Sequence, residues 1–269
     1  MHNKWIAHSR VEDSSVIRLF CFHYAGGSAV YFSKWKEYLN PTIDVCAVQL
    51  PMREHRINES MPGSIQEIAH LFVRDTTELF DKPFILFGHS MGAIIAYEVA
   101  RKLEKLYGKK AQKLIVSGCA APSCPDHISS KKDVMKMSVE ELCLLLRDYG
   151  QISAQLMENQ DFLDYYIPII RNDFHLCQQY SLGEVHSVDS PIIALTGDND
   201  PFIKEKEDIN EWMNFTNKGF ESLSFPGQHF FIDDNAEKIL KIISSETIKE
   251  HRKKGLDELI HKREIISVD

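Results

Sequence analysis

Short apolar runs alternate with helical patterns along most of the chain. Five runs are almost continuously apolar, which is typical of parallel strands covered on both faces of a sheet. They are residues 16–22, 44–50, 83–88, 113–118 and 191–197. A sixth run, residues 220–227, alternates apolar and polar positions and suits an edge strand. Helical patterns lie between the runs, at residues 64–80, 93–106 and 203–214. This order predicts an α/β fold with a mostly parallel sheet flanked by helices.

The alternation is interrupted once, between residues 123 and 183, where no good strand pattern occurs. Ser138 and Glu141 have capping-box spacing, and Gly150 is a good stop for the helix that they begin. A second helical stretch, residues 154–180, contains Pro168 and should kink or split there. About sixty residues between two strands is far more than a usual crossover.

These observations predict the domain organisation. Residues 123–183 form a helical lid, inserted into a core made of residues 1–122 and 184–247. The alternative is that the insertion only adds packing and has no role at a functional site. The remaining residues, 248–269, are highly charged. A solvated helix is the default interpretation of such a tail, and we assign it no function.

Length and composition limit the class of protein. The chain has 269 residues, of which 43% are hydrophobic and 26% charged, enough to build one sizeable core. No apolar run reaches the roughly 18 residues that span a bilayer, and the first residues lack an apolar stretch like that of a secretory signal. We therefore expect a cytoplasmic protein without a membrane partner. The net charge of −8 argues against nucleic acid as a partner.

Six cysteines are scattered along the chain, and no two of them form a C-x-x-C pair. Most lie inside apolar segments. Reduced, buried thiols are therefore the preferred interpretation over disulfides or metal ligands.

A nucleophile motif follows the third apolar run. The residues Gly88-His89-Ser90-Met91-Gly92 fit G-x-S-x-G, with a predicted strand before the motif and a predicted helix after it. The pattern alone is common by chance, so the context carries the prediction. The glycines lack the Cβ atoms that would crowd a tight turn. We predict that Ser90 is a nucleophile at this turn, and that the start of the following helix stabilises negative charge there.

A serine nucleophile needs a base and an acid that orients it. In chains with this motif, the acid and then the histidine follow the serine along the sequence. The run 191–197 ends in a loop with Asp198 and Asp200, and His229 lies in a glycine-containing turn after the last run. We prefer Asp200 as the acid, with Asp198 as the alternative that more simply caps the turn. We prefer His229 as the base because of its position; the other candidates considered are His175, His186, His251 and His261.

The loop after the first run supplies the second half of an oxyanion hole in such an arrangement. Here the loop contains Ala25, Gly26 and Gly27 and no charged side chain. We predict that the backbone N–H groups of Ala25 and Met91 are the two donors. A tight strand-to-helix turn is the simpler interpretation of the glycines, and the two are compatible.

Together these segments resemble the type II thioesterases, the free-standing editing hydrolases of polyketide and nonribosomal peptide synthetases. The resemblance covers about residues 16–243. It is carried by FHYAGGSA, Trp35, AVQLPMREHR, FGHSMGAIIAYEVA, SGCAAP, IPIIRNDFHLCQQY, GDNDP and FPGQHFF, in that order. It implies an α/β-hydrolase fold, a Ser90–His229–Asp200 triad, and oxyanion amides at Ala25 and Met91.

The resemblance also implies a substrate. The enzyme would hydrolyse acyl thioesters from the phosphopantetheine arm of an acyl or peptidyl carrier protein, through an acyl-serine. Neither a cofactor nor a metal is expected, and a monomer is usual in the family. The insertion would surround the acyl chain; candidates to line this chamber, or simply to pack the core, are Leu142, Leu145, Leu146, Phe162 and Tyr166.

Three residues depart from the family pattern. His23 and Tyr24 replace the proline and histidine of FPHAGGSA, and Met52 replaces the glycine of QLPGR. These positions border the site mouth in the family, so the substrate fit is expected to differ. Three other functions remain open: a generic serine esterase or lipase, an acyltransferase that uses the same acyl-serine, and a non-enzymatic interaction module.

Overall fold

The computed structural model describes residues 3–8, 15–124, 132–148, 150, 154–183, 185–203 and 206–244. Within these ranges, seven strands form one sheet in the order β1-β3-β2-β4-β5-β6-β7. The strands are β1 (Ile6–His8), β2 (Ile17–Phe22), β3 (Ile43–Val48), β4 (Phe84–His89), β5 (Lys113–Ser117), β6 (Ile192–Gly197) and β7 (Phe220–Phe225). All neighbours pair in parallel except β1, which is antiparallel to β3. The predicted α/β fold with a mostly parallel sheet is confirmed.

The six predicted strands are all present, with ends within two residues of the predicted ones. The mostly apolar β3 and β4 are buried along their whole length, as expected for strands covered on both faces. β7 is at the edge of the sheet, which confirms the prediction from its alternating pattern. β1 was not predicted because three residues are too few to show a period.

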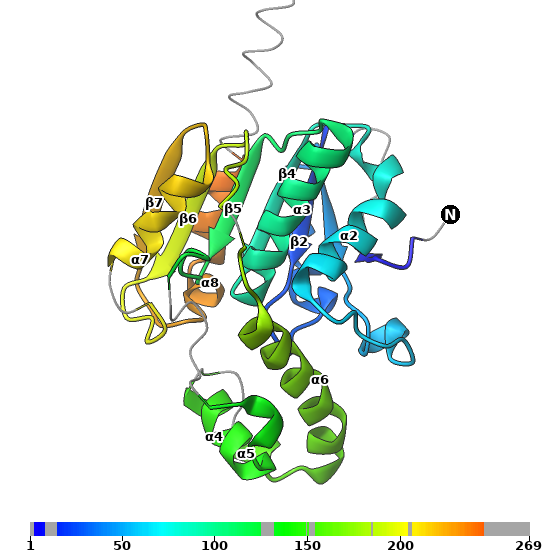
Figure 1. The fold of residues 1–269 in the computed structure, drawn as a ribbon, viewed down its shortest axis with the longest axis vertical. Helices are drawn as coiled ribbons and strands as arrows, with labels where there is room; N and C mark the ends of the chain where they lie inside the picture. Colours follow the sequence, from blue (N-terminus) through cyan, green and yellow to red (C-terminus); the bar gives the residue numbers. More distant parts are fainter. Residues whose placement is uncertain are drawn as a thin grey trace, which may run out of the picture.

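Helices cover both faces of the sheet (Figure 1). On one face, α2 (Ile65–Asp75) and α3 (Met91–Tyr107) pack their apolar sides onto the strands. On the other face, the core includes Phe32, Trp35, Phe231 and Ile239, which come from Ala29–Phe32, α1 (Trp35–Tyr38), α8 (Phe231–Asp234) and the helical residues 236–244. The sheet is therefore the middle layer of three, and its carboxyl edge is left to carry a site.

Two predicted helices are shorter in the structure, and each continues as a 3-10 turn. The pattern at residues 64–80 forms α2 and then a 3-10 helix over Thr77–Phe80. The pattern at 203–214 forms α7 (Lys206–Asn210) and a 3-10 helix over Glu211–Phe215. No helix among the described residues is long and apolar enough to cross a membrane.

Between β5 and β6 the described residues form helices and no strand. A 3-10 turn (Val134–Lys136) precedes α4 (Val139–Asp148), α5 (Ala154–Met157) and α6 (Gln160–Gln179). These elements project from one end of the sheet domain (Figure 1). The capping box is confirmed, because Ser138 and Glu141 each accept a hydrogen bond from the other's backbone N–H. Gly150 has a φ of +73°, as expected of a helix stop.

Of the kink or split predicted at Pro168, the split is wrong: α6 runs through Pro168 without a break, and the helical stretch 154–180 is interrupted at residues 158–159 instead. A kink at Pro168 stays a prediction. Proline removes the hydrogen bond to the carbonyl four residues earlier, that of Asp164. Pro168 and Asp164 are both exposed. Water can therefore satisfy the carbonyl, and the helix keeps its buried face of Ile167, Ile170 and Phe174.

The five residues expected to line an acyl chamber have different environments. Leu142 and Leu146 are fully buried in the hydrophobic core, whereas Leu145, Phe162 and Tyr166 are partly buried against it. Phe162 and Tyr166 stack with ring centroids 5.0 Å apart. A lining role for the five residues stays a prediction, as does the lid role of the insertion. The charged tail 248–269 lies outside the described residues.

Candidate active site

Ser90 occupies the corner between β4 and α3, in a conformation that serine rarely adopts. Its φ is +55° and its ψ is −121°, and its N–H donates to the Ser117 carbonyl at 2.7 Å. Left-handed φ values cost a residue with a Cβ of order 1 kcal/mol or more, so the surroundings must hold this turn in place. Because of this turn, the Ser90 side chain projects from the edge of the sheet rather than packing against a helix or strand.

The two glycines of the motif are required by the closeness of neighbouring backbone. A Cβ on Gly88 would lie 2.0 Å from the Gly92 carbonyl oxygen, and a Cβ on Gly92 would lie 2.1 Å from that of Phe22. Heavy atoms that are not bonded to each other do not approach that closely in a folded protein. The glycines therefore let β4 turn directly into α3, and let α3 begin beside the end of β2.

His229 bridges Ser90 and Asp200. Its Nε2 is 3.1 Å from Ser90 Oγ, and its Nδ1 is 2.9 Å from Asp200 Oδ2. Asp200 and His229 are both buried, whereas Ser90 is half-buried. Asp200 Oδ1 also accepts a hydrogen bond from the Phe202 N–H at 3.0 Å, which fixes the carboxylate plane. The three side chains predicted to form a triad thus lie together in the order hydroxyl, imidazole, carboxylate.

Backbone contacts between two loops bring His229 to Asp200. The N–H of Asn199 donates to the Gly227 carbonyl at 3.0 Å, and Gly227 has a φ of +131°. Gly197 also permits the approach, because a Cβ there would lie 2.4 Å from the Gln228 carbonyl oxygen. The loops after β6 and β7 are therefore held against each other at the carboxyl edge of the sheet.

The structure also shows where the rejected candidates lie. Asp198 is exposed and its carboxylate accepts a hydrogen bond from Ser224, so it does not contact His229. His175 lies on α6, and His186 is exposed in the segment before β6. His251 and His261 lie outside the described residues.

The loop after β2 forms a tight turn over residues 24–27. The Gly27 N–H donates to the Tyr24 carbonyl at 2.9 Å, and Gly26 has a φ of +79°, as the third position of a type II turn requires. Because Gly92 touches the backbone of Phe22, this turn and the first turn of α3 are neighbours. Ala25 and Met91 thus lie at the same end of the sheet, and their role as oxyanion donors stays a prediction.

A second histidine, His89, lies beside the catalytic candidate. It is fully buried, its Nδ1 is 3.0 Å from Ser117 Oγ, and its ring centroid is 5.1 Å from that of His229. Burial and the neighbouring His229 hold the pKa of His89 well below its usual value. His89 is therefore neutral at physiological pH and does not oppose a positive charge on His229.

Aromatic rings surround the imidazole of His229. Phe202 and Phe230 have ring centroids 5.2 and 5.3 Å from it, and Tyr24 packs against Phe230 at 4.8 Å. Burial raises the pKa of Tyr24 to about 12, so its hydroxyl stays protonated. Of the two departures in this loop, Tyr24 thus lies over the site, whereas His23 is 1% exposed and its Nδ1 is 2.9 Å from the Tyr24 carbonyl oxygen.

Sequence reasoning missed an ion pair beside the 24–27 turn, between Arg53 and Asp173. Both residues lie in segments that carry the family resemblance, but no role was assigned to them. The available signal was a charged residue within an otherwise apolar helical face, at Asp173. Elsewhere, the described residues contain no group of three His, Cys, Asp or Glu side chains that could hold a metal ion.

A serine hydrolase of the α/β-hydrolase fold is the class that this sheet and this side-chain geometry define. The model of the thioesterase domain family matches residues 17–247. The chain therefore belongs to the thioesterase family, enzymes that hydrolyse thioester bonds.

Individual relatives agree with the family. The chain is 30% identical over 241 residues to the gramicidin S biosynthesis protein GrsT of Aneurinibacillus migulanus, covering 90% of this chain and 93% of that protein. It is 31% identical over 224 residues to the medium-chain S-acyl fatty acid synthase thioesterase of Rattus norvegicus, covering 81% and 82%. The structure of the type II thioesterase BorB from the borrelidin biosynthetic cluster superimposes with a TM-score of 0.80 at 31% identity, covering 91% of this chain and 99% of that one.

Proposed function

We propose that this enzyme is a type II, editing thioesterase, which removes acyl groups from the phosphopantetheine arm of carrier proteins in a polyketide or nonribosomal peptide synthetase. The observation that carries the chemistry is the continuous contact from Ser90 through His229 to Asp200 at the carboxyl edge of the sheet. Two similar proteins support the substrate class: GrsT is named for gramicidin S biosynthesis, and BorB is named as a type II thioesterase from the borrelidin biosynthetic cluster.

In the first half of the reaction, Ser90 Oγ attacks the thioester carbonyl carbon and His229 Nε2 takes the hydroxyl proton. The Nδ1–H of His229 donates to Asp200, which holds the imidazole in the required tautomer and stabilises its charged form. The carbonyl oxygen becomes an oxyanion between the N–H groups of Ala25 and Met91, each worth roughly 3–4 kcal/mol in such sites. The C–S bond then breaks, the thiol leaves with the proton from His229, and an acyl-serine remains.

In the second half, water attacks the acyl-serine carbonyl while His229 accepts a proton from the water. The tetrahedral intermediate collapses, Ser90 Oγ recovers the proton, and the free acid leaves. A thioester has little resonance between sulfur and carbonyl, and its thiolate is a good leaving group. The side chains and amides of the site are thus sufficient for both steps.

The proposal extends to partners and compartment. An acyl or peptidyl carrier protein presents the substrate, and the reaction takes place in the cytoplasm. Six buried cysteines without a disulfide are usual for proteins of a reducing compartment.

A panel of carrier proteins tests the proposal. Carrier proteins loaded with acyl groups from acetyl to medium-chain fatty acyl, and with aminoacyl groups, are incubated with the enzyme and the released acid is measured. Hydrolysis should fall by more than about 10³-fold in Ser90→Ala and in His229→Ala. The two aspartates provide a matched pair: Asp200→Asn should cost about 10⁴-fold, whereas Asp198→Asn should change the rate less than about threefold, because its carboxylate contacts Ser224 and not His229.

The same measurements separate the alternatives. A generic esterase would hydrolyse free acyl esters faster than carrier-bound thioesters. An acyltransferase would give a new ester or amide when an acceptor alcohol or amine is added. An interaction module would not be labelled by a fluorophosphonate at Ser90. The fatty acyl members of the panel test the activity named for the rat relative.

A further inference from the structure

The buried ion pair missed by sequence reasoning joins two segments 120 residues apart in the chain. Arg53 Nη1 and Nη2 donate to Asp173 Oδ2 and Oδ1 at 2.6 and 2.7 Å, a two-pronged pair. The side chains are 2% and 0% exposed. Arg53 lies in the loop after β3, and Asp173 lies on α6.

Both partners use their remaining hydrogen bonds on the turn at residues 24–27. Asp173 Oδ2 accepts from the Gly26 N–H at 2.8 Å, and Arg53 Nη1 also donates to the Gly27 carbonyl at 3.0 Å. These groups belong to the two residues that follow Ala25, whose N–H the proposed mechanism uses. The pair therefore holds the turn from its donor side and from its acceptor side.

The backbone around Arg53 is shaped to aim it inward. Met52 and Glu54 have φ values of +66° and +50°, so Arg53 stands between two of the three residues other than glycine that have positive φ in the described chain. The third is Ser90. The Nε of Arg53 also donates to the Pro51 carbonyl at 3.0 Å, so the guanidinium is held by its own loop as well. Such strain persists only where other interactions hold it, and it concentrates at functional sites.

α6 contacts the turn through a continuous face. A Cβ on Gly26 would lie 2.4 Å from the Tyr166 hydroxyl and 2.5 Å from Ile170 Cδ1. Tyr166, Ile170 and Asp173 are spaced by four and three residues, so they share one side of the helix. The turn is thus enclosed between α6 and the Arg53 guanidinium.

We propose that Arg53 and Asp173 are positioning residues for the oxyanion hole: they fix the 24–27 turn so that the Ala25 N–H meets the oxyanion, and they make this geometry depend on α6. The inference rests on the proposed function only in assigning the oxyanion to this turn. It predicts that the pair acts on the transition state and not on substrate binding.

Two conservative variants test it. Asp173→Asn places an NH₂ group against Arg53 or the Gly26 N–H, and Arg53→Lys keeps the charge but cannot contact Asp173 and Gly27 in the same planar arrangement. The substrate is p-nitrophenyl butyrate, an activated ester that a nucleophilic Ser90 can attack without a carrier protein. In both variants kcat should fall at least about tenfold, with KM within about twofold of wild type. Affinity for a trifluoromethyl ketone, which forms a tetrahedral oxyanion on Ser90, should fall in the same proportion. Affinity for a thioether of the same chain length, which has no carbonyl for Ser90 to attack, should not change.

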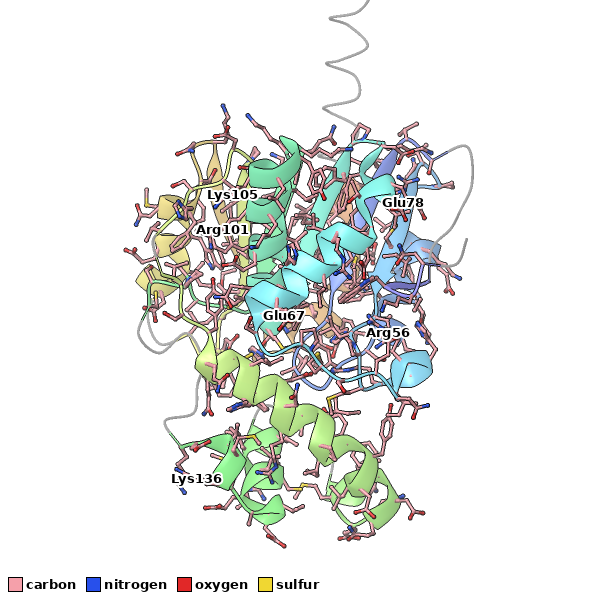
Figure 2. The ribbon with its side chains drawn as sticks, turned by 45° about the vertical axis from the view of Figure 1, so that its right-hand side comes forward. Arg56, Glu67, Glu78, Arg101, Lys105 and Lys136 are labelled. Atoms are coloured by element: carbon pink, nitrogen blue, oxygen red, sulfur yellow. The ribbon has the colours of Figure 1, made fainter. Side chains whose placement is uncertain are left out.

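Glu98→Gln is the matched control. Glu98 is also a buried carboxylate, 2% exposed, and it ties the end of α6 to α3 by accepting from the Tyr180 hydroxyl at 2.8 Å. It is paired with Arg101, which Figure 2 shows on α3. None of its hydrogen bonds reaches the turn. This variant can lose stability, but its kcat and both inhibitor affinities should match those of the wild type.

If a single variant does not fold, the double variant Arg53→Met/Asp173→Leu removes both charges and replaces them with apolar bulk. It should fold and still show the loss of kcat, because neither hydrogen bond to the turn is restored. Wild-type kcat in folded Asp173→Asn and Arg53→Lys would overturn the inference, as would equal weakening of the ketone and the thioether. If the wild type cleaves the p-nitrophenyl ester but no carrier thioester, the proposed function fails and the inference is still tested.

Discussion

Met52 shows how a single substitution of the family pattern is accommodated. It stands where the resemblance to type II thioesterases implies glycine, and its φ of +66° lies in the left-handed region that glycine adopts without a steric penalty. Its N–H donates to the carbonyls of Arg56 and Glu59, so the surrounding loop holds it in this conformation. The strain of this position is therefore a cost that the chain tolerates.

Reverting Met52 should stabilise the protein. A left-handed conformation destabilises the folded state of a residue with a Cβ by about 1–2 kcal/mol, and glycine removes this strain. Glycine also gives the unfolded chain more conformational freedom, which offsets about 0.4–1 kcal/mol of the gain. We expect Met52→Gly to raise the free energy of unfolding by about 0.5–1 kcal/mol, measured by urea denaturation. Met213→Gly is the control: Met213 is exposed and lacks positive φ, so this change should destabilise the protein. A loss of stability in Met52→Gly as large as in the control would contradict the expectation.

His23 makes the fold sensitive to acid. Burial is the main reason that its pKa is lowered from 6.5 to about 4, and the nearby Arg53 contributes to the shift. Between these two values the unfolded chain binds a proton that the folded chain does not, so stability decreases as the pH falls from about 6.5 to about 4. The penalty at pH 5 is about 2 kcal/mol from this residue.

His23→Asn tests this pH dependence. Asparagine keeps an N–H donor for the Tyr24 carbonyl, 2.9 Å from His23 Nδ1, but does not titrate. The difference in urea midpoint between pH 7.5 and pH 5 should be smaller in the variant than in the wild type. It should not vanish, because His89 shifts in the same direction. An equal difference in both proteins would show that His23 is not the group responsible.

At this scale, local sequence signals predicted the positions of Ser90, Asp200 and His229 because motif, chain order and strand ends together restrict the choice. The Arg53–Asp173 pair could not be predicted in this way. Its partners lie 120 residues apart, and only the path of α6 across the 24–27 turn brings them together.

Among the elements, the start of α3 depends most on close backbone packing. Gly92 is in its first turn, and a Cβ there would lie 2.1 Å from the Phe22 carbonyl oxygen and 2.6 Å from its carbon. Neither atom can move without shifting β2. The contact therefore sets the distance between the nucleophile and the 24–27 turn.

Gly92→Ala should destabilise the protein by at least about 2 kcal/mol, although alanine is the better helix former, because the clash is with backbone. Any folded fraction should have reduced kcat, since α3 must move away from β2. Thermal unfolding and ester hydrolysis measure the two effects. Gly219→Ala is the control: its Cβ would meet nothing within 4 Å and its φ is not positive, so the change should stay within about 0.5 kcal/mol. A stable, active Gly92→Ala enzyme would refute the packing argument.

The elements also show what a one-dimensional pattern can predict. Continuous apolar runs identified the buried parallel strands because burial on both faces leaves no polar positions. β1 was missed because its three residues form a strand only by pairing with β3. The split at Pro168 was wrongly predicted because the sequence shows the missing N–H but not that the affected side of α6 faces water.

In the whole molecule, the insertion and the sheet domain meet through α6. This helix packs on the 24–27 turn by Tyr166 and Ile170 and carries Asp173 into the ion pair. Tyr180, the residue directly after the helix, donates a hydrogen bond to Glu98 on α3. Weakening the Arg53–Asp173 ion pair should therefore destabilise both the 24–27 turn and α6, which are distant in the sequence.

Hydrogen exchange can detect this coupling. In Arg53→Lys, amides of residues 24–27 and of the second half of α6 should exchange faster together, while β4 and α3 keep their wild-type protection. Glu98→Gln should affect only the end of α6 and its contact with α3. Faster exchange spread evenly over the whole sheet domain in Arg53→Lys would instead indicate a general loss of stability.

The six cysteines have a further consequence for an enzyme of this family. In the proposed function, every turnover liberates a pantetheine thiol, which can reduce disulfides by thiol–disulfide exchange. All six cysteines of this chain are buried, and burial raises the pKa of Cys21, Cys46 and Cys177 well above the usual value, so that they are not ionised. The six cysteines thus form no disulfide that the released thiol could reduce, and its accumulation should leave the fold unchanged.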